Sequence, residues 1–382
     1  MSIEAPTTEA PRVVLHIGLA KTGTTFLQHT LRERRPELAA HRVAYPDLGP
    51  AGMFRAAVGV TGRHQRWGFT EKATRPLWSE LCARARSHQG TTVMGHEVLS
   101  SAGADARRQI ATDLADVDLS IVVTARDLAR QIPAWWQERV KNQYTFSFTE
   151  LVDQVIRPRR PGRRNGLFWR SQDLGAVLRR WSEVVPPERL HLVIAPPPGA
   201  PGHVLWDRFA TAVGLPAGAV APLDTARNPS LGTTEIALLR RVNEALDDRL
   251  PPRQHARVVK HFFAERILTG RSSRRAVTPA EFAEPLTRVT AEWVQQIQRD
   301  GHPVHGDLDE LRPVCAPPDS PYPDQVDSAE LVASANRAVA DLLVEVARLR
   351  TELGQTHAQL RRAQRAAEAA QVVAAEAAEA PT

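Results

Sequence analysis

Cysteine is scarce in this chain of 382 residues. The two cysteines, Cys82 and Cys315, lie far apart, and neither has a Cys or His at the spacing of metal ligands. A disulfide scaffold is therefore excluded, and no bound metal is expected. Long apolar runs are missing as well. Because about 20 consecutive apolar residues are needed to cross a bilayer, we expect no transmembrane segment.

The N-terminus has no apolar stretch of the kind found in secretory leaders. The first twelve residues contain Pro, Thr and Glu instead. We therefore expect a disordered N-terminus over residues 1–12 and a cytoplasmic location. With 42% hydrophobic and 24% charged residues, the composition is that of a soluble globular protein. The length allows two or three domains.

Lysine is also scarce. The chain carries 49 basic and 43 acidic residues, a net charge of +6, and the basic residues are almost all arginine. The planar guanidinium group suits phosphate and sulfate, so this composition favours an anionic small-molecule ligand, and we expect no nucleic-acid partner. A GC-rich coding sequence gives the same excess of arginine and is the alternative explanation.

Short apolar segments alternate with helical patterns along the first half of the chain. A helix is predicted from Thr24 to Arg34, where Pro36 follows, and others over 232–250 and 258–269. Alternating strands and helices predict an α/β fold, with a central parallel sheet of the P-loop type flanked by helices. The predicted strands are 13–17, 43–45, 91–95, 119–124 and 190–194.

The predicted α/β domain covers residues 1–311. An arginine-rich stretch over 157–180 is expected to begin as an exposed basic loop. Five prolines, at positions 313, 317, 318, 321 and 323, predict a stiff extended linker over 312–327.

A heptad pattern follows the linker. Apolar residues recur at alternating steps of three and four for about five heptads, from Val332 to Ala370, which predicts a coiled-coil helix over 328–371 and a homo-oligomer. A disordered tail is expected over 372–382. The alternative is a single helix packed on its own domain, because the seam weakens to alanine after Leu360. The seam positions are Val332, Ala335, Val339, Leu342, Val346, Leu349, Leu353, Thr356, Leu360, Ala363, Ala367 and Ala370.

The segment 18–25, Gly-Leu-Ala-Lys-Thr-Gly-Thr-Thr, lies between the first predicted strand and the first predicted helix. Backbone N–H groups and the positive end of a helix dipole can surround a phosphate at such a turn. The usual nucleotide triphosphate loop has a lysine directly after its last glycine, but here Thr24 follows Gly23 and the lysine, Lys21, lies inside the loop.

This loop resembles the 5'-phosphosulfate loop of sulfotransferases, Pro-Lys-Ser/Thr-Gly-Thr-Thr, and departs from it only at Ala20. The resemblance continues through Phe26 to Gln28 and through Val43 to Pro46, as in bacterial members of the family. It implies that Lys21, Thr22, Gly23, Thr24 and Thr25 bind the donor 3'-phosphoadenosine 5'-phosphosulfate (PAPS).

The family's second donor site has an arginine at the end of a later strand and a serine eight residues further on, both binding the 3'-phosphate. Arg126 follows the predicted strand 119–124 and matches the arginine. Ala134 stands where the serine should be. The family's Arg-Lys-Gly loop is also missing, and its nearest substitutes are Arg271, in a basic segment, and the polar turn that holds Arg227 and Ser230.

Sulfuryl transfer to a hydroxyl needs a base at the incoming oxygen and positive charge at the bridging oxygen of the donor. Lys21 suits the second role. Glu97, in a segment that resembles Ser-x-Glu-x-Leu of bacterial sulfotransferases, is the first candidate for the base, and His96 is the second. We expect these two side chains to point in different directions. A structural pairing of Glu97 with an arginine is the alternative.

The acceptor is predicted to be a carbohydrate, a glycolipid or a small secondary metabolite. His64 and the tryptophans are candidates for contacting it, although tryptophans at helical spacing usually belong to the core. The combined prediction is a PAPS-dependent sulfotransferase that works without a metal. The alternatives are a P-loop small-molecule kinase and a non-catalytic coiled-coil scaffold with a decayed nucleotide domain. The tryptophans concerned are Trp135, Trp136, Trp169 and Trp181.

Overall fold

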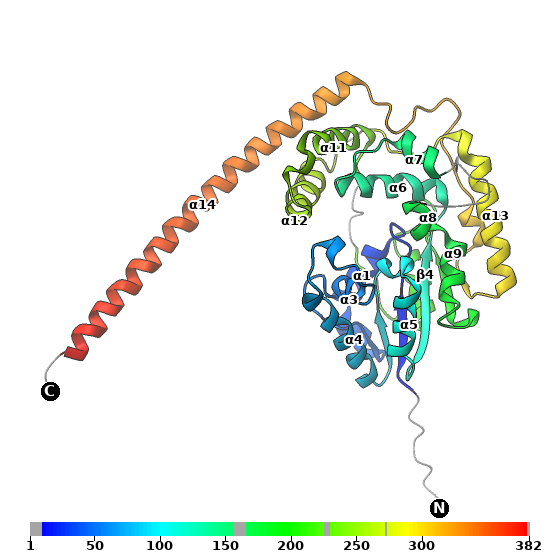
Figure 1. Cartoon of the computed structure of the whole chain (residues 1–382), viewed down its shortest axis with the longest axis horizontal. Coiled ribbons are helices and arrows are strands. Elements are labelled where there is room, and N and C mark those ends of the chain that lie inside the picture. The colour runs from blue at the N-terminus through cyan, green and yellow to red at the C-terminus, as the bar shows by residue number, and fades with distance from the viewer. Residues whose placement is uncertain (1–9, 156–165, 225–229, 272, 380–382) are drawn as a thin grey trace, which may run out of the picture.

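A parallel sheet forms the centre of the protein, as the computed structural model shows (Figure 1). The structure describes residues 10–155, 166–224, 230–271 and 273–379. Within these ranges the sheet has six strands in the order β2-β3-β1-β4-β5-β6, and every neighbouring pair is parallel. The strands are β1 (Arg12–His16), β2 (Val43–Ala44), β3 (Thr91–Met94), β4 (Asp118–Ala125), β5 (Leu190–Ile194) and β6 (Val304–His305).

Helices cover both faces of this sheet, so its strands are apolar on both sides. Leu15 of β1 packs in the larger of two hydrophobic clusters, together with residues of α4, α5, α6 and α9. Val14, its neighbour, points to the other face and packs with Leu27 of α1 and Phe209 of α10. This two-sided burial explains why the strands read as continuous apolar segments.

The helices follow the alternation that the sequence predicts. They are α1 (Thr24–Glu33), α2 (Arg35–Ala40), α3 (Gly52–Val60), α4 (Arg75–Ser87), α5 (Ala104–Asp113), α6 (Leu128–Lys141), α7 (Phe148–Val155), α8 (Leu167–Gln172), α9 (Leu174–Trp181), α10 (Val204–Val213), α11 (Thr233–Leu246), α12 (Pro252–His255), α13 (Ala283–Asp300) and α14 (Ser328–Glu379), with a π-helix, η6 (Ala256–Ile267), after α12. No helix in the described ranges has both the length and the apolar character to span a membrane.

The α/β class is confirmed, and all five predicted strands are present within a residue or two. The structure adds β6, which has two residues and therefore no periodicity to detect. It also corrects two details. Arg12 belongs to β1, not to a disordered segment, and the helix predicted over 258–269 is the π-helix η6. The start of the predicted basic loop, 156–165, lies outside the described residues.

The proline-rich stretch 312–327 is extended but lies against the α/β body. The backbone N–H of Ala316 donates to the carbonyl of Thr278 at 2.8 Å, and the guanidinium of Arg274 donates to the carbonyl of Pro321 at 2.7 Å. The hydroxyl of Tyr322 donates to Glu281 at 2.5 Å. This stretch therefore guides α14 to the body and does not hold it away.

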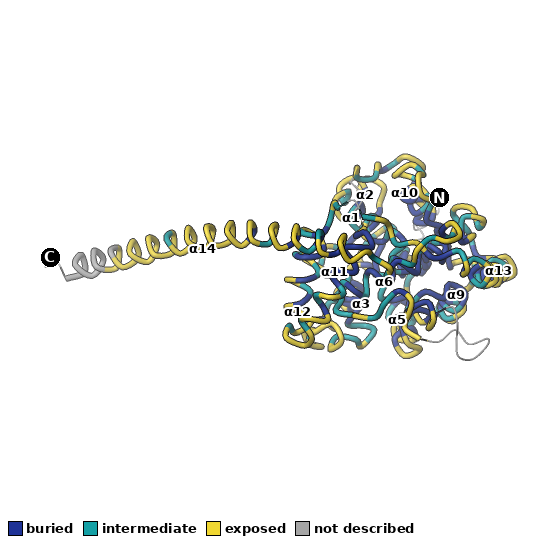
Figure 2. The backbone as a smooth tube through the Cα atoms, turned by 90° about the horizontal axis from the view of Figure 1, so that it is seen from above, coloured by how far each residue is buried: buried dark blue, intermediate teal, exposed yellow. Residues whose placement is uncertain are grey.

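Helix α14 has a packed part and a projecting part (Figures 1 and 2). Its first turns lie against α11 and bury Leu331, Ser334 and Ala338, and Arg271 donates to Asp341 at 2.7 Å. Beyond Glu345 the helix extends from the body, and its side chains are mostly exposed up to residue 368. The helix continues to Glu379, past the end predicted at 371.

Candidate functional site

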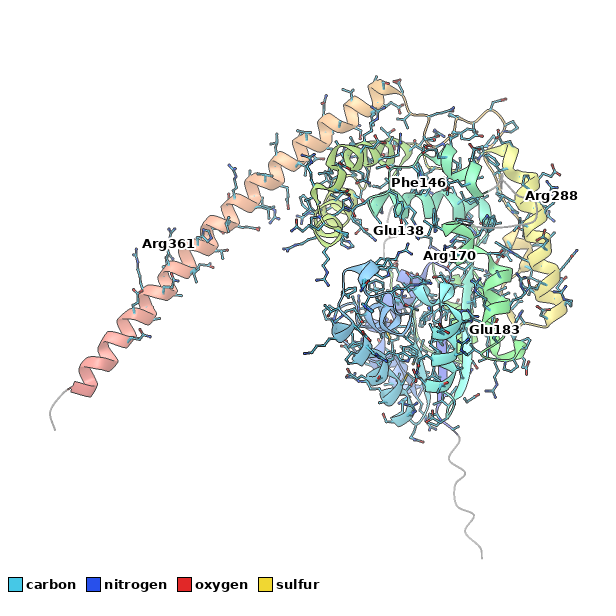
Figure 3. The ribbon with its side chains drawn as sticks, in the orientation of Figure 1. Glu138, Phe146, Arg170, Glu183, Arg288 and Arg361 are labelled. Atoms are coloured by element: carbon cyan, nitrogen blue, oxygen red, sulfur yellow. The ribbon has the colours of Figure 1, made fainter. Side chains whose placement is uncertain are left out.

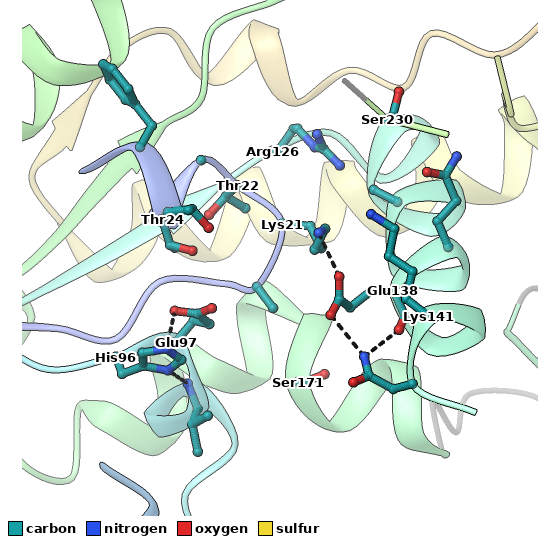
Figure 4. A pocket seen from close by; sticks show the side chains of 18 of the residues that line it. Lys21, Thr22, Thr24, His96, Glu97, Arg126, Glu138, Lys141, Ser171 and Ser230 are labelled. Atoms are coloured by element: carbon teal, nitrogen blue, oxygen red, sulfur yellow. Dashed lines mark hydrogen bonds and ion pairs between the residues drawn. The ribbon is translucent and has the colours of Figure 1, made fainter. Parts of the chain in front are cut away.

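Three loops meet at the carboxyl edge of the sheet and line one cleft of about 2380 Å³. The segment 18–25 follows β1, the segment 95–99 follows β3, and Arg126 follows β4. The connection after β1 runs to one side of the sheet, whereas β4 lies on the other side of β1. Ligands of open α/β sheets bind at such a reversal, so the topology identifies this edge as the site (Figure 4).

The loop after β1 has a backbone path with three left-handed residues. Gly18, Lys21 and Gly23 have φ angles of 46°, 71° and 93°. The positive φ angle of Gly23 favours glycine there, and a Cβ atom would also lie 2.4 Å from Cδ2 of Leu205, which would have to move. Successive turns of this kind point backbone N–H groups into a concave, anion-binding surface.

Two side chains from the body brace this loop. The Thr22 hydroxyl donates to the carbonyl of Leu19 at 2.6 Å and lies 2.6 Å from the Thr124 hydroxyl of β4. The Gln131 side-chain amide of α6 donates to the carbonyl of Ala20. Thr22 therefore holds the loop with its side chain and has only its backbone N–H to offer a ligand.

The loop ends at the N-terminus of α1, which no described side chain caps. The first N–H groups of a helix have no partner inside the helix and carry partial positive charge. Gly23, Thr24 and Thr25 all line the cleft at this point. The arrangement suits a phosphate or sulfate group, as the sequence predicts.

Lys21 lies beside a carboxylate that the sequence analysis missed (Figure 4). Its Nζ is 3.0 Å from Oε2 of Glu138 in α6, and Nζ of Lys260 in η6 is 2.7 Å from Oε1 of the same residue. Burial alone would raise the pKa of Glu138, but the two lysines hold it far below its ordinary value. Glu138 is therefore ionised at neutral pH and fixes the position of Lys21.

A third lysine adds to this cationic end of the cleft. Lys141 is the last residue of α6 and lines the cleft next to Asn142. Burial and the charge of Lys21 lower its pKa. An anion bound nearby would reduce this repulsion, so the local field favours anion binding.

Arg126 lines the same cleft from the end of β4. Its guanidinium donates to Oε1 of Gln131 at 3.2 Å and to the carbonyl of Arg130 at 2.8 Å. Burial and the charge of Arg130 lower its pKa to about 10. Ala134, on the next turn of α6, also lines the cleft and offers no hydroxyl.

His96 and Glu97 form a pair, which corrects the expectation that they point apart. Nε2 of His96 is 3.3 Å from Oε2 of Glu97, and both residues line the cleft. The reason is the sharp turn after β3, where Gly95 has a φ angle of 113° and a 3-10 helix, η3 (Glu97–Ser101), begins at once. The second partner of Glu97 is the amide of Gln28 at 3.0 Å and not an arginine.

The pair has a defined ionisation state at neutral pH. Burial lowers the pKa of His96. Burial would raise the pKa of Glu97, but His96 and the hydrogen bond from Gln28 bring it below its ordinary value. His96 is therefore neutral and Glu97 ionised. Beneath them, burial lowers the pKa of His16 to about 4.

The other residues predicted to bind the sulfuryl donor do not all lie in the cleft. Ser230 lines the cleft, whereas Arg227 lies outside the described residues. Arg271 points elsewhere, because its guanidinium donates to the carbonyl of Ser334 at 3.0 Å and to Asp341, both on α14. The structure thus gives Arg271 a role in anchoring that helix.

The tryptophans that the sequence suggests for stacking on the acceptor do not line the cleft. The four tryptophans considered from the sequence are buried in the core, none more than 3% exposed. Trp67, in the 3-10 helix η1 (Gln65–Trp67), is 38% exposed and lines the cleft instead. His64 is half-buried next to this helix. The buried tryptophans are Trp135, Trp136, Trp169 and Trp181.

Comparisons with known proteins find similarity among solved structures. No family model matches the chain, and no curated protein matches it. Among solved structures, the chain is similar to a sulfotransferase from Alicyclobacillus acidocaldarius, with 16% identity and a TM-score of 0.38. The match covers 66% of this chain and 96% of that chain. By its description that protein belongs to the family that the loop resembles.

Proposed function

We propose that this protein transfers the sulfuryl group of PAPS to a hydroxyl group of an acceptor. The observation that carries the proposal is the uncapped N-terminus of α1 with Lys21 inside the loop before it and Arg126 in the same cleft. The donor has an anionic group at each end, and the cleft offers two cationic sites for them. The described residues contain no cluster of three or more metal-ligating side chains.

The 5'-phosphosulfate fits the loop 18–25. The donors there are backbone N–H groups, and the Thr25 hydroxyl is exposed toward the cleft. Lys21 would place its charge on the bridging oxygen, which becomes negative when the bond from sulfur to that oxygen breaks. Before the donor binds, the ion pair with Glu138 holds Lys21 at the cleft, and Lys260 holds Glu138 in place.

The 3'-phosphate fits Arg126. Its two hydrogen bonds go to neutral oxygens, and no carboxylate among the described residues bonds to its guanidinium. The pKa of Arg126 is lowered, which means that its positive charge is disfavoured in the free protein. A phosphate partner would stabilise that charge. The alanine at position 134 leaves this phosphate without the family's serine, so Arg126 carries more of the recognition.

Glu97 is the group that would accept the acceptor's proton. Nδ1 of His96 accepts from the backbone N–H of Val98 at 3.3 Å, so its other nitrogen, Nε2, carries the proton and donates to Glu97. Both histidine nitrogens are then engaged. His96 and Gln28 both contact Oε2 of Glu97, so we assign its other oxygen, Oε1, to the acceptor. The acceptor oxygen attacks sulfur, its proton moves to Glu97, and 3'-phosphoadenosine 5'-phosphate leaves with the electrons of the broken bond.

Titration calorimetry with 3'-phosphoadenosine 5'-phosphate and with ATP tests the proposal. We expect the first nucleotide to bind at least tenfold more tightly, because ATP has no 3'-phosphate for Arg126. Tighter binding of ATP would favour the kinase alternative. Binding of neither nucleotide would favour the scaffold alternative.

A further inference from the structure

The cleft has a second cationic region on the side of His96 and Glu97. Arg63, Arg66, Arg139 and Arg170 line it, and Arg253 lies at its margin. Burial and the charges of Arg66 and Arg170 lower the pKa of Arg63. For Arg139, burial lowers the pKa and Arg66 adds to the effect. These arginines are thus close enough to repel one another.

Carboxylates balance this group only in part: Glu138 acts to raise the pKa of Arg139, and no carboxylate that the structure records shifts that of Arg63. Arg63 donates to the hydroxyl and the carbonyl of Ser101. Arg139 stacks on Trp135, with its guanidinium carbon 4.5 Å from the ring centre. Among the residues that the structure describes, no carboxylate pairs with Arg63, Arg66, Arg139 or Arg170. Glu138 offsets part of the charge of Arg139, whereas Arg63, Arg66 and Arg170 have no ion pair within the described part of the chain. Clustered positive charges of this kind are typical of a site for an anion.

Aromatic rings connect this group to the proposed base. The ring of Phe54 lies 5.0 Å from that of His96 and 5.0 Å from that of Trp67. Phe69 is 6.0 Å from Phe54, and the guanidinium of Arg253 lies 5.3 Å from the Phe69 ring. A wall of rings therefore runs from the His96–Glu97 pair to the arginines, with Trp67 open to the cleft.

The donor does not account for these arginines. The charged groups that shift the pKa of Arg126 are Arg130 and Asp127, and those that shift the pKa of Arg63 are Arg66 and Arg170. Arg126 and Arg63 therefore have different charged neighbours. A donor that spans Lys21 and Arg126 leaves the second group for the other substrate.

We propose that the acceptor is an acidic glycoside: a ring compound that bears the reactive hydroxyl and also a carboxylate, sulfate or phosphate. The ring packs on Trp67 and Phe54, and the anionic group binds between Arg66 and Arg170. The hydroxyl then reaches Glu97 at the other end of the aromatic wall. This inference rests on the proposed function and names its acceptor class.

A matched pair of probes tests the inference: phenyl β-D-glucuronide and phenyl β-D-glucoside, which differ in one carboxylate. Binding is measured by calorimetry on the full chain saturated with 3'-phosphoadenosine 5'-phosphate. We expect the glucuronide to bind at least tenfold more tightly. The double variant Arg66→Gln/Arg170→Gln should remove most of this preference and leave glucoside binding within about threefold.

Arg288→Gln is the control, since Arg288 lies on α13 with an exposed side chain far from Arg170 (Figure 3). It should keep the full preference. Equal binding of the two probes, binding of neither, or a preference that survives the double variant would overturn the inference. Nucleotide binding is measured in the same samples. If the nucleotide binds and the preference is absent, the acceptor class is wrong and the proposed function stands; if the nucleotide fails to bind, the proposed function fails.

Discussion

The cleft and the projecting part of α14 are both surfaces that the described chain leaves uncovered, but surfaces of opposite kinds. The cleft presents cationic side chains and the N–H groups of α1. Residues 346–368 of α14 present apolar side chains, with Val346, Leu349, Leu353 and Leu360 each 45–55% exposed. Each surface favours a complementary partner: the cationic cleft favours an anion, and the apolar helix face favours another apolar helix face.

The two parts also differ in how they are held. The cleft is built on strands whose side chains are buried on both faces, and Thr124 and Gln131 brace its loop. The packed turns of α14 use Leu331, Ser334 and Ala338 against α11, whereas the seam positions Val332 and Val339 remain more than half exposed. Packing on the body uses the seam positions Ala335 and Leu342, which are partly buried. It leaves Val332, Val339 and the seam positions from Val346 to Leu360 available for a second copy of the chain.

The largest expected effect concerns the cationic end of the cleft. Lys21→Ala should lower turnover with PAPS by roughly 100-fold or more, because the charge at the leaving oxygen is lost. Folding should change little, since Lys21 is partly exposed. Turnover is measured with labelled PAPS. Lys72→Ala is the control, because Lys72 is an exposed lysine outside this cleft. Near-normal turnover of the Lys21 variant would exclude its role.

The next effect separates the two ends of the donor. Arg126→Ala should weaken binding of 3'-phosphoadenosine 5'-phosphate by about 1.5 to 3 kcal/mol, the range for a charge-assisted hydrogen bond. Binding of adenosine 5'-phosphosulfate, which has no 3'-phosphate, should change little. Calorimetry with both nucleotides measures the difference. Equal losses would remove Arg126 from the 3'-phosphate site.

A third prediction concerns His16 at the end of β1, which is 2% exposed and whose Nε2 is 3.5 Å from the Thr124 hydroxyl. Its pKa is about 4 in the folded state, against an ordinary value of 6.5 for histidine, so below pH 6.5 the unfolded chain binds a proton that the folded chain does not. This histidine should therefore lower stability as pH falls from 6.5 to 4, by about 1 to 3 kcal/mol.

Denaturant unfolding at pH 7 and pH 4.5 measures this effect. The variant His16→Gln should lose less stability between the two pH values than the unaltered protein does. His29→Gln removes an exposed histidine and should leave the difference in place. An unchanged pH dependence in the His16 variant would show that other groups cause it.

The smallest effect on turnover is expected at α14. A chain that ends at residue 345 keeps the turns that pack on α11 and should retain turnover within about twofold. Its mass in solution should be that of a monomer, whereas the full chain should associate at micromolar concentration through the exposed seam. Light scattering measures both. A monomeric full chain would contradict the coiled-coil prediction.

A chain that ends at residue 323 provides the comparison. It loses Leu331 and Ala338 from the body as well as Glu330, whose carboxylate accepts from Thr234 at 3.3 Å. It should therefore unfold at a lower temperature than the chain that ends at 345. Equal melting temperatures would mean that the first turns of α14 contribute little to the body.

Local signals were sufficient for the elements that depend on neighbours in sequence. The strands after Pro11 and before Arg126 have apolar runs, and the loop 18–25 has its glycines at fixed spacing, so both the sheet and the position of this loop between a strand and a helix were predictable. The strand of two residues, β6, has no such signal. The start of α14 and most of its length were predictable from its heptads, but its packing on α11 was not.

The sequence by itself determined the α/β class, the position of the phosphate loop and its lysine, because these follow from patterns within about ten residues. Only the tertiary structure decided which groups meet across longer separations. Glu138 lies 117 positions from Lys21 and 122 from Lys260, and no periodicity links three such residues. The His96–Glu97 pair depends on a turn at Gly95. The arginine cluster arises because α8 and the segment around Trp67 come to one cleft when the chain folds around its sheet.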